Sequence, residues 1–193
     1  MRGSSTLIPS ARKTFAVSLE YSKLKRQNRR FVVLNSAQVK GSTMLEVGDK
    51  IPTFSLKQTD GSTVKSSDWQ GKSVVLFFYP EDDTPGCTLE ACSLRDGYSE
   101  FQKKGVLVFG ISPDGVESHV KFTEKFNLPY PLLADPGHVV ADKFGVWVEK
   151  NLYGKKSMGI ARTTFVIAPD GKIARVIKQV NKEQHAAQLL ETL

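Results

Sequence analysis

A nearly continuous run of apolar residues at positions 73–79 constrains the fold of this 193-residue chain more than any other feature. Because polar and apolar side chains do not alternate there, the run is typical of a strand that is buried on both faces of a sheet. Such a strand needs helices on both sides of the sheet to cover it. The sequence therefore predicts an α/β fold with this strand at its centre.

Strand and helix patterns alternate along the chain from about residue 44. Residues 53–56 and 62–65 flank a turn at Asp60-Gly61 and predict an N-terminal β-hairpin. The order of elements predicts a parallel or mixed central sheet with helices on both faces. The segment around Trp147 is expected to be a loop. Further strands are expected at 105–111, 132–134, 163–167 and 173–177, and helices at about 84–103, 112–126, 135–145 and 182–192.

The two cysteines, Cys87 and Cys92, follow the central strand. Thr84 is favourable at a helix N-cap and Pro85 at the first helical position, so a helix is expected to begin there with Cys87 in its first turn. A thiol with a pKa near ~8.5 is about 3% ionised at pH 7, whereas a helix N-terminus and a cation can bring the pKa to ~6.5 and make it roughly three-quarters ionised. The position therefore suits a nucleophilic thiolate.

Three acidic residues, Asp82, Asp83 and Glu90, are close to Cys87 in the sequence. Their negative charges would oppose a thiolate, and the helix terminus by itself supplies at most about 2 kcal/mol. An active Cys87 therefore predicts an Arg or Lys that folds back onto it from a distant part of the chain.

The spacing of the two cysteines is too wide for a bond within a helix. Residues i and i+5 of an α-helix have Cα atoms ~8.6 Å apart. A disulfide tolerates at most about 7 Å. We therefore expect that a bond between Cys87 and Cys92 requires local unwinding over residues 84–93.

Purely structural or metal-binding roles for the cysteines are less favoured. Two buried structural cysteines would not need the Thr84-Pro85-Gly86 lead-in, and a structural disulfide across so short a loop would constrain the unfolded chain little. A zinc site is disfavoured because the histidines show no ligand spacing. They are interpreted as surface or helix residues: His119, His138 and His185.

Residues 1–42 differ in charge from the rest of the chain. They hold nine Lys or Arg and one acidic residue, whereas residues 43–193 hold 18 basic and 19 acidic residues. Such a leader, rich in Arg and Ser and without a secretory apolar core, predicts a cleaved transit peptide in front of one folded domain at 43–193. A disordered basic tail is the alternative. Because the folded domain is nearly neutral, nucleic-acid binding is not expected.

With these residues assembled, the chain resembles the peroxiredoxins, in particular the peroxiredoxin Q or bacterioferritin-comigratory subgroup of plant or algal plastid type. The resemblance covers about residues 44–193. It implies a thioredoxin-like fold and reduction of peroxides by a thiol, without metal, haem or flavin. Four stretches carry it: Phe77-Phe78-Tyr79-Pro80 with Asp83-Thr84-Pro85-Gly86-Cys87-Thr88-Leu89-Glu90-Ala91-Cys92, then Gly110-Ile111-Ser112, Phe144-Gly145-Val146-Trp147, and Gly159-Ile160-Ala161-Arg162-Thr163-Thr164-Phe165.

The resemblance also implies the site and the cycle. Cys87 takes the role of the peroxidatic nucleophile, which becomes a sulfenic acid, and Cys92 that of the resolving thiol in an intramolecular, atypical 2-Cys disulfide. Arg162 fills the position of the distant cation. The peroxide pocket is expected to be shaped by Pro80, Thr84, Gly86 and Arg162.

The implied partners are small peroxides and thioredoxin or a similar dithiol reductant, and the expected form is a monomer. The resemblance and the leader together predict a chloroplast location, in the stroma or associated with the thylakoid, with the mitochondrion as the alternative. The apolar run at 74–79 is too short to span a bilayer, so at most peripheral membrane contact is expected.

Two other functions remain open from the residues. A general dithiol oxidoreductase would act on protein disulfides, although its usual two-residue spacing between cysteines is absent. A redox sensor or holdase would use an oxidised, unwound segment to recruit a partner.

Overall fold

The computed structural model describes residues 43–152 and 154–193. Within them a seven-stranded sheet has the order β2-β1-β5-β4-β3-β8-β9, and β6 and β7 form a separate hairpin. The strands are β1 (Ser55–Gln58), β2 (Thr63–Lys65), β3 (Ser73–Phe78), β4 (Val106–Ser112), β5 (Leu132–Ala134), β6 (Trp147–Leu152), β7 (Lys155–Ile160), β8 (Thr163–Ile167) and β9 (Ile173–Ile177). The helices are the 3-10 helix η1 (Ser66–Trp69), α2 (Pro85–Asp96), α3 (Tyr98–Lys103), α4 (Val116–Phe126), α5 (Val139–Lys143) and α6 (His185–Leu190).

The sheet is mixed, as the order of elements predicts. Strand β3 runs parallel to β4 and antiparallel to β8, and β4 runs parallel to β5. The two parallel pairs need crossover connections, which α2 with α3 and α4 supply. The N-terminal hairpin joins this sheet through an antiparallel contact between β1 and β5.

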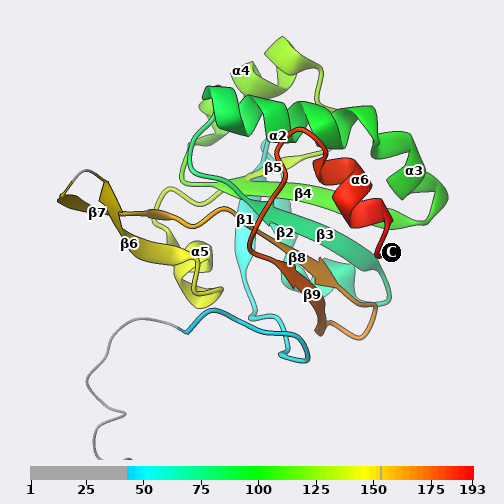
Figure 1. The fold of residues 1–193 in the computed structure, drawn as a ribbon. Helices are drawn as coiled ribbons and strands as arrows, with labels where there is room; N and C mark the ends of the chain where they lie inside the picture. The colour runs from blue at the N-terminus through cyan, green and yellow to red at the C-terminus, as the bar shows by residue number, and fades with distance from the viewer. Residues whose placement is uncertain (1–42, 153) are drawn as a thin grey trace, which may run out of the picture. The chain divides into compact units, whose positions relative to one another are not determined.

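Helices cover both faces of the sheet because β3 is apolar on both sides. Val75 and Phe77 pack in a cluster with residues of α2, α3, α4 and α6, whereas Val74 and Leu76 pack in a second cluster with residues of η1 and α5. Figure 1 shows α2, α3 and α6 together on one side of the sheet. Successive side chains of a strand point to opposite faces, so alternate residues of β3 enter the two clusters. The continuous apolar run therefore indicates a core on each face of the sheet.

Gly110 in β4 allows the aromatic layer to pack closely against the sheet. A Cβ atom at this position would lie 2.7 Å from both Phe77 Cζ and Leu132 Cδ2. Phe77 in turn stacks on Tyr79 with their ring centroids 5.5 Å apart. The missing side chain therefore lets the rings sit directly over the strand that neighbours β3.

Two predicted elements differ from the structure. The helix expected over 84–103 is broken at Gly97, where a Cβ atom would lie 2.5 Å from Ala186 Cβ of α6, so the close approach of α6 favours glycine at the break. The loop expected around Trp147 is wrong, because β6 and β7 form a hairpin there. Its sequence, with Glu149, Lys150 and Asn151 in succession, lacks the apolar alternation that would reveal a strand.

The interpretation of the histidines as surface or helix residues is confirmed for two of them as helix residues, although neither lies at the surface. His119 in α4 and His185 in α6 are fully buried. A carboxylate contacts each of them, Asp82 for His119 and Glu90 for His185. Such partners offset the cost of removing a polar ring from water.

The predicted leader at 1–42 lies outside the described residues and stays a prediction. Among residues 43–152 and 154–193, no helix is long and apolar enough to cross a bilayer.

Gly145 provides a test of the packing between the start of the described chain and the end of α5. Its φ of +68° is shared by Gly105, but only at Gly145 would a Cβ atom collide with the backbone of Thr43 and Met44. Gly105→Ala is expected to lower the free energy of unfolding by about 1 kcal/mol through backbone strain. Gly145→Ala is expected to cost about 1–3 kcal/mol more, because the overlap adds to the strain. Urea unfolding of both variants measures the difference, and equal losses would contradict the packing.

Candidate active site

The site lies where β3 ends and α2 begins. Thr84 occupies the N-cap position in an extended conformation, Pro85 is the first helical residue, and Cys87 lies in the first turn with 3% of its surface exposed. The expected side-chain cap is absent, because the Thr84 hydroxyl donates to the Glu81 carbonyl at 3.2 Å. The backbone amides of the first turn therefore keep their capacity to bind a negative group beside Cys87.

Arg162 reaches this helix from a distant part of the chain. Its Nη2 atom donates to Cys87 Sγ at 3.1 Å. The sheet register explains this meeting, because Phe78 at the end of β3 pairs with Thr163 at the start of β8. Arg162 directly precedes β8 and therefore lies beside the segment that leads into α2. The structure thus brings the sequence-predicted cysteine and cation together.

Glu90 holds the other side of the Arg162 guanidinium. Its Oε2 atom pairs with Arg162 Nη1, and its carboxylate is fully buried. Because Glu90 follows Cys87 by three residues, both side chains lie on one face of α2 and a single guanidinium can bind both. We call these three groups, Cys87, Glu90 and Arg162, the thiolate clasp.

The negative charge of Glu90 opposes a thiolate, as the sequence predicts, but its spacing of three from Cys87 also signals a shared helix face. The geometry makes Glu90 the group that orients Arg162. The pKa of Arg162 reflects this: burial of the guanidinium opposes its charge, but Glu90 and Cys87 outweigh that effect and raise the pKa above its ordinary value.

His185 extends the clasp into the core, a role that was not predicted from the sequence. Its Nδ1 atom lies 3.2 Å from Glu90 Oε1, and no hydrogen bond joins the two atoms. Its Nε2 atom is 3.0 Å from the Thr164 hydroxyl. Glu90, His185 and Thr164 are all fully buried. Nothing near His185 in the sequence indicates this contact, because α6 and α2 meet only in the folded chain.

Two lysines also approach the clasp. A Cβ atom at Gly86 would lie 3.6 Å from Lys182 Nζ and 3.8 Å from Arg162 Nη2, so Gly86 lies beside both cations. Lys150 of β6 is half-buried, and burial followed by repulsion from Arg162 lowers its pKa, which Cys87 partly offsets. The surroundings of Cys87 are therefore more cationic than its sequence neighbours suggest.

Asp82 is turned away from Cys87 into a buried network of its own. Its carboxylate accepts hydrogen bonds from the Tyr79 and Ser118 hydroxyls, each at 2.7 Å, and contacts His119 Nδ1 at 2.9 Å. Burial and then the charge of Asp82 raise the pKa of Tyr79 well above its ordinary value, so the phenol stays a donor. The network holds the loop that carries Pro80 and Thr84, and Pro80 is half-buried at the end of β3.

Asp83 also has a partner elsewhere, since it pairs with Lys125 Nζ at 2.6 Å on the exposed surface. The expectation that Asp82 and Asp83 oppose a thiolate is therefore wrong in the folded chain, because each carboxylate has its own partners. Only Glu90 among the three acids stays next to the site.

Cys92 lies in the same uninterrupted helix as Cys87, and both thiols are free. Cys92 is half-buried, whereas Cys87 is buried. The helical geometry that separates the two residues beyond disulfide distance is therefore present in this state.

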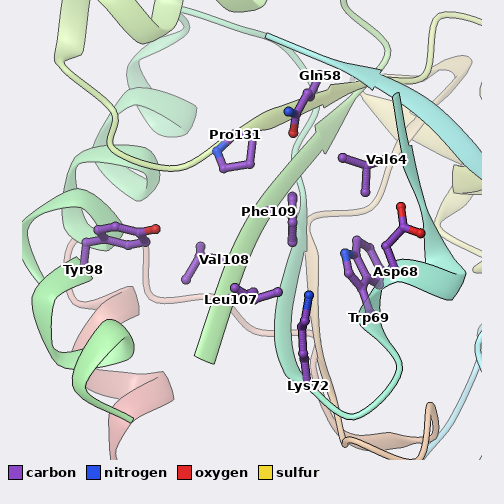
Figure 2. Close-up of a pocket in the computed structure, with 10 residues that line it drawn as sticks. All are labelled: Gln58, Val64, Asp68, Trp69, Lys72, Tyr98, Leu107, Val108, Phe109 and Pro131. Atoms are coloured by element: carbon purple, nitrogen blue, oxygen red, sulfur yellow. The ribbon is translucent and has the colours of Figure 1, made fainter. Parts of the chain in front are cut away.

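A pocket elsewhere in the fold does not serve this chemistry. It is a hollow of about 270 Å³ beside the first half of β4. Figure 2 shows the residues that line it, with Trp69, Leu107 and Phe109 among them. These residues lie where β3 and β4 begin, whereas Cys87 follows the end of β3. Within the described residues, no group of three or more His, Cys, Asp or Glu side chains is placed to hold a metal ion.

Comparisons with known proteins agree with this site. Residues 47–176 match the model of the AhpC/TSA family. The chain is 47% identical over 149 residues to a putative peroxiredoxin bcp of Coxiella burnetii, covering 77% of this chain and 99% of that protein. It is 46% identical to peroxiredoxin Bcp of Bacillus subtilis, covering 77% and 95% of the two chains.

Solved structures show the same fold. The bacterioferritin comigratory protein of Xanthomonas campestris aligns with a TM-score of 0.71 and 33% identity over 76% of this chain and 96% of that one. A cysteine-to-serine mutant of PrxQ from Xylella fastidiosa aligns with a TM-score of 0.73 and 32% identity over 78% and 96% of the two chains. These alignments confirm the predicted thioredoxin-like fold.

The chain therefore belongs to the AhpC/TSA family, as a peroxiredoxin of the Bcp/PrxQ group. It is a thiol-dependent peroxidase and an antioxidant enzyme. Membership of this family implies peroxides as substrates and a thioredoxin-type reductant.

The predicted location is wrong by the same comparison. The matched relatives come from bacteria such as Coxiella burnetii, Bacillus subtilis and Escherichia coli, which have neither chloroplasts nor mitochondria. They give no support to a plastid-type assignment or to a transit peptide at 1–42.

Arg162 is expected to control the reactivity of Cys87. Arg162→Ala removes the cation from the sulfur, so the pH profile of Cys87 alkylation by iodoacetamide should move to higher pH by at least about one unit. Mass spectrometry of the alkylated protein from pH 5 to 9 measures this profile. Arg175→Ala is the matched control, because Arg175 is exposed on β9, and it should keep the wild-type profile. An unchanged profile in Arg162→Ala would remove Arg162 from the site.

Proposed function

We propose that Cys87 is the peroxidatic cysteine and that Cys92 resolves its sulfenic acid within the same chain, in an atypical 2-Cys cycle. The observation that carries this proposal is the hydrogen bond from Arg162 Nη2 to Cys87 Sγ at the first turn of α2. A structural cysteine needs neither a cation on its sulfur nor a helix terminus behind it. Both features favour the thiolate, which is the reactive form.

The first step is a displacement at oxygen. The Cys87 thiolate attacks one oxygen of the hydroperoxide, so an S–O bond forms, the O–O bond breaks, and the departing oxygen takes both electrons of that bond and then a proton. Thr84, the Cys87 amide and Arg162 are the groups proposed to hold the peroxide, with Pro80 and Gly86 beside them. Arg162 and the amide then stabilise the charge that develops on the departing oxygen.

The second step requires α2 to unwind at its start. The Cys92 thiolate attacks Cys87 sulfur and a hydroxide leaves, which takes a proton to give water and an intramolecular disulfide. Side chains tie down the second half of α2: the Tyr130 hydroxyl donates to the Ala91 carbonyl at 2.7 Å, and Arg95 donates to the Phe126 carbonyl at 2.9 Å. The first half depends on the thiolate clasp. We therefore assign the movement to the half that carries Cys87.

A dithiol protein of the thioredoxin type is proposed to reduce the resulting disulfide by thiol exchange. The bacterioferritin comigratory protein of Xanthomonas campestris has alkyl peroxide reduction activity, which supports organic hydroperoxides as substrates here beside hydrogen peroxide. Because both cysteines belong to one chain, the cycle needs no second copy, and we propose that the enzyme acts as a monomer. At most peripheral membrane contact is proposed.

Cys87→Ser is expected to abolish peroxide reduction, because the serine hydroxyl stays protonated and does not attack the O–O bond. Consumption of hydrogen peroxide in the presence of thioredoxin, thioredoxin reductase and NADPH measures the activity. Cys87→Ser and the wild type should have the same far-ultraviolet circular dichroism. Substantial turnover by the folded variant would defeat the assignment of Cys87.

Cys92→Ser is expected to separate the two steps. The variant should consume about one equivalent of peroxide, form a sulfenic acid at Cys87 and then stop with thioredoxin as the reductant. Trapping of the sulfenic acid with dimedone, followed by mass spectrometry, identifies the species. Sustained thioredoxin-dependent turnover at the wild-type rate would show that Cys92 does not resolve the intermediate.

A further inference from the structure

The buried groups behind Cys87 do not balance in charge when the thiol is ionised. The Cys87 thiolate and the Glu90 carboxylate contribute two negative charges, and Arg162 contributes one positive charge. Cys87 and Glu90 are 3% and 0% exposed, and the Arg162 side chain is 20% exposed. An uncompensated charge is costly in such surroundings, so a further positive charge close to Glu90 would stabilise the ionised site.

His185 is placed to supply that charge. Its imidazole is wholly buried, and its Nδ1 atom lies 3.2 Å from Glu90 Oε1, whereas Arg162 pairs with Glu90 Oε2. Within the described part of the chain, neither His185 Nδ1 nor Glu90 Oε1 has a hydrogen-bond partner. Both atoms are buried and lack a partner, so a proton added to the ring nitrogen stabilises both: the nitrogen becomes a donor and the carboxylate oxygen an acceptor.

Thr164 allows His185 to exist in both protonation states. The hydroxyl lies 3.0 Å from His185 Nε2. When the neutral ring carries its proton on Nε2, the hydroxyl accepts from that nitrogen, and it accepts again in the imidazolium, whose second proton lies on Nδ1 beside Glu90. The site therefore accepts a proton without leaving the far nitrogen unsatisfied, and no rearrangement of β8 or α6 is needed.

We propose that His185 is a positioning residue that takes up a proton when Cys87 ionises, and that it acts on the thiolate through Glu90 and Arg162. The proton lost by the thiol is thereby matched by one gained at the imidazole, so the buried site keeps its net charge. Consumption of the thiolate by peroxide removes the negative charge and releases the proton again. This inference rests on the proposed role of Cys87.

Other charged and titratable groups face the same cluster. Lys182 in the segment before α6 is exposed, and Lys150 of β6 is half-buried. Tyr130, before β5, has its pKa raised well above the ordinary value by burial and then by Glu90, so it stays neutral. Phe77 of β3 faces His185 edge-on and carries no charge. Among these groups, His185 alone is both fully buried and in contact with Glu90.

The test compares two substitutions by glutamine that have opposite expected effects on the alkylation profile of Cys87. His185→Gln removes the capacity to carry a proton, so the midpoint should move to higher pH by about one unit. Glu90→Gln removes the opposing negative charge, so the midpoint should move to lower pH. A loss of packing alone would lower the rate at every pH and would not move the midpoint. His138→Gln, which removes a histidine stacked on Trp147, is the control and should keep the wild-type midpoint.

A double-mutant cycle tests whether the effect passes through Glu90. In Glu90→Gln/His185→Gln the second change should add no shift, because the imidazole then has no carboxylate through which to act. Independent shifts of the two changes would overturn the route through Glu90.

Imidazole nitrogen NMR of the wild-type chain gives a readout that needs no change at His185. The ring should be an imidazolium in the reduced protein at pH 7 and neutral in the disulfide form. The same protonation state in both forms, or an unchanged midpoint in His185→Gln, would overturn the proposal and leave the balancing charge to Lys150 or solvent. Peroxide consumption by the wild type, abolished in Cys87→Ser, separates this outcome from failure of the proposed function.

Discussion

The contact of Arg162 with Cys87 and Glu90 is the interaction on which the rest of the site depends. One guanidinium binds positions three residues apart on α2, so it stabilises the sulfur and the first turn of the helix together. The sheet makes this possible, because the antiparallel pairing of β3 with β8 brings Arg162 to the point where α2 begins. Charge on the sulfur and order in the helix are therefore two effects of one contact.

In the proposed cycle, this coupling sets the order of events. While Cys87 is a thiolate, Arg162 has two anionic partners on α2 and the helix is held in the form that excludes a bond to Cys92. Oxidation to sulfenic acid removes the charge of one partner and weakens the hold on the first turn. The step that consumes peroxide therefore favours the unwinding that the next step needs.

Much of the fold follows from the sequence, because apolar periodicity reports burial directly. The run at 73–79 became β3, and the Thr84-Pro85 signal placed the start of α2. The β6–β7 hairpin was missed because it lies outside the main sheet, and its sequence lacks the alternation of apolar and polar residues that indicates a strand. The helix over 84–103 was predicted too long because its break depends on a tertiary contact of Gly97 with α6.

The main residues of the site were also predictable from the sequence. Local chemistry pointed to Cys87 and required a distant cation, and family resemblance placed that cation at Arg162. Spacing along the helix could have joined Glu90 to Cys87. His185 could not be found in this way, because its role depends on how α6 packs against α2, which no local pattern records.

Hydrogen exchange of α2 in the reduced and disulfide forms tests the central claim most directly. Amides of residues 88–90 should lose protection by at least about 100-fold when the disulfide forms, because their helical hydrogen bonds open. Amides of β3 should keep their protection in both forms. Equal protection of residues 88–90 in the two forms would contradict the proposed unwinding, because the disulfide would then form within an intact helix.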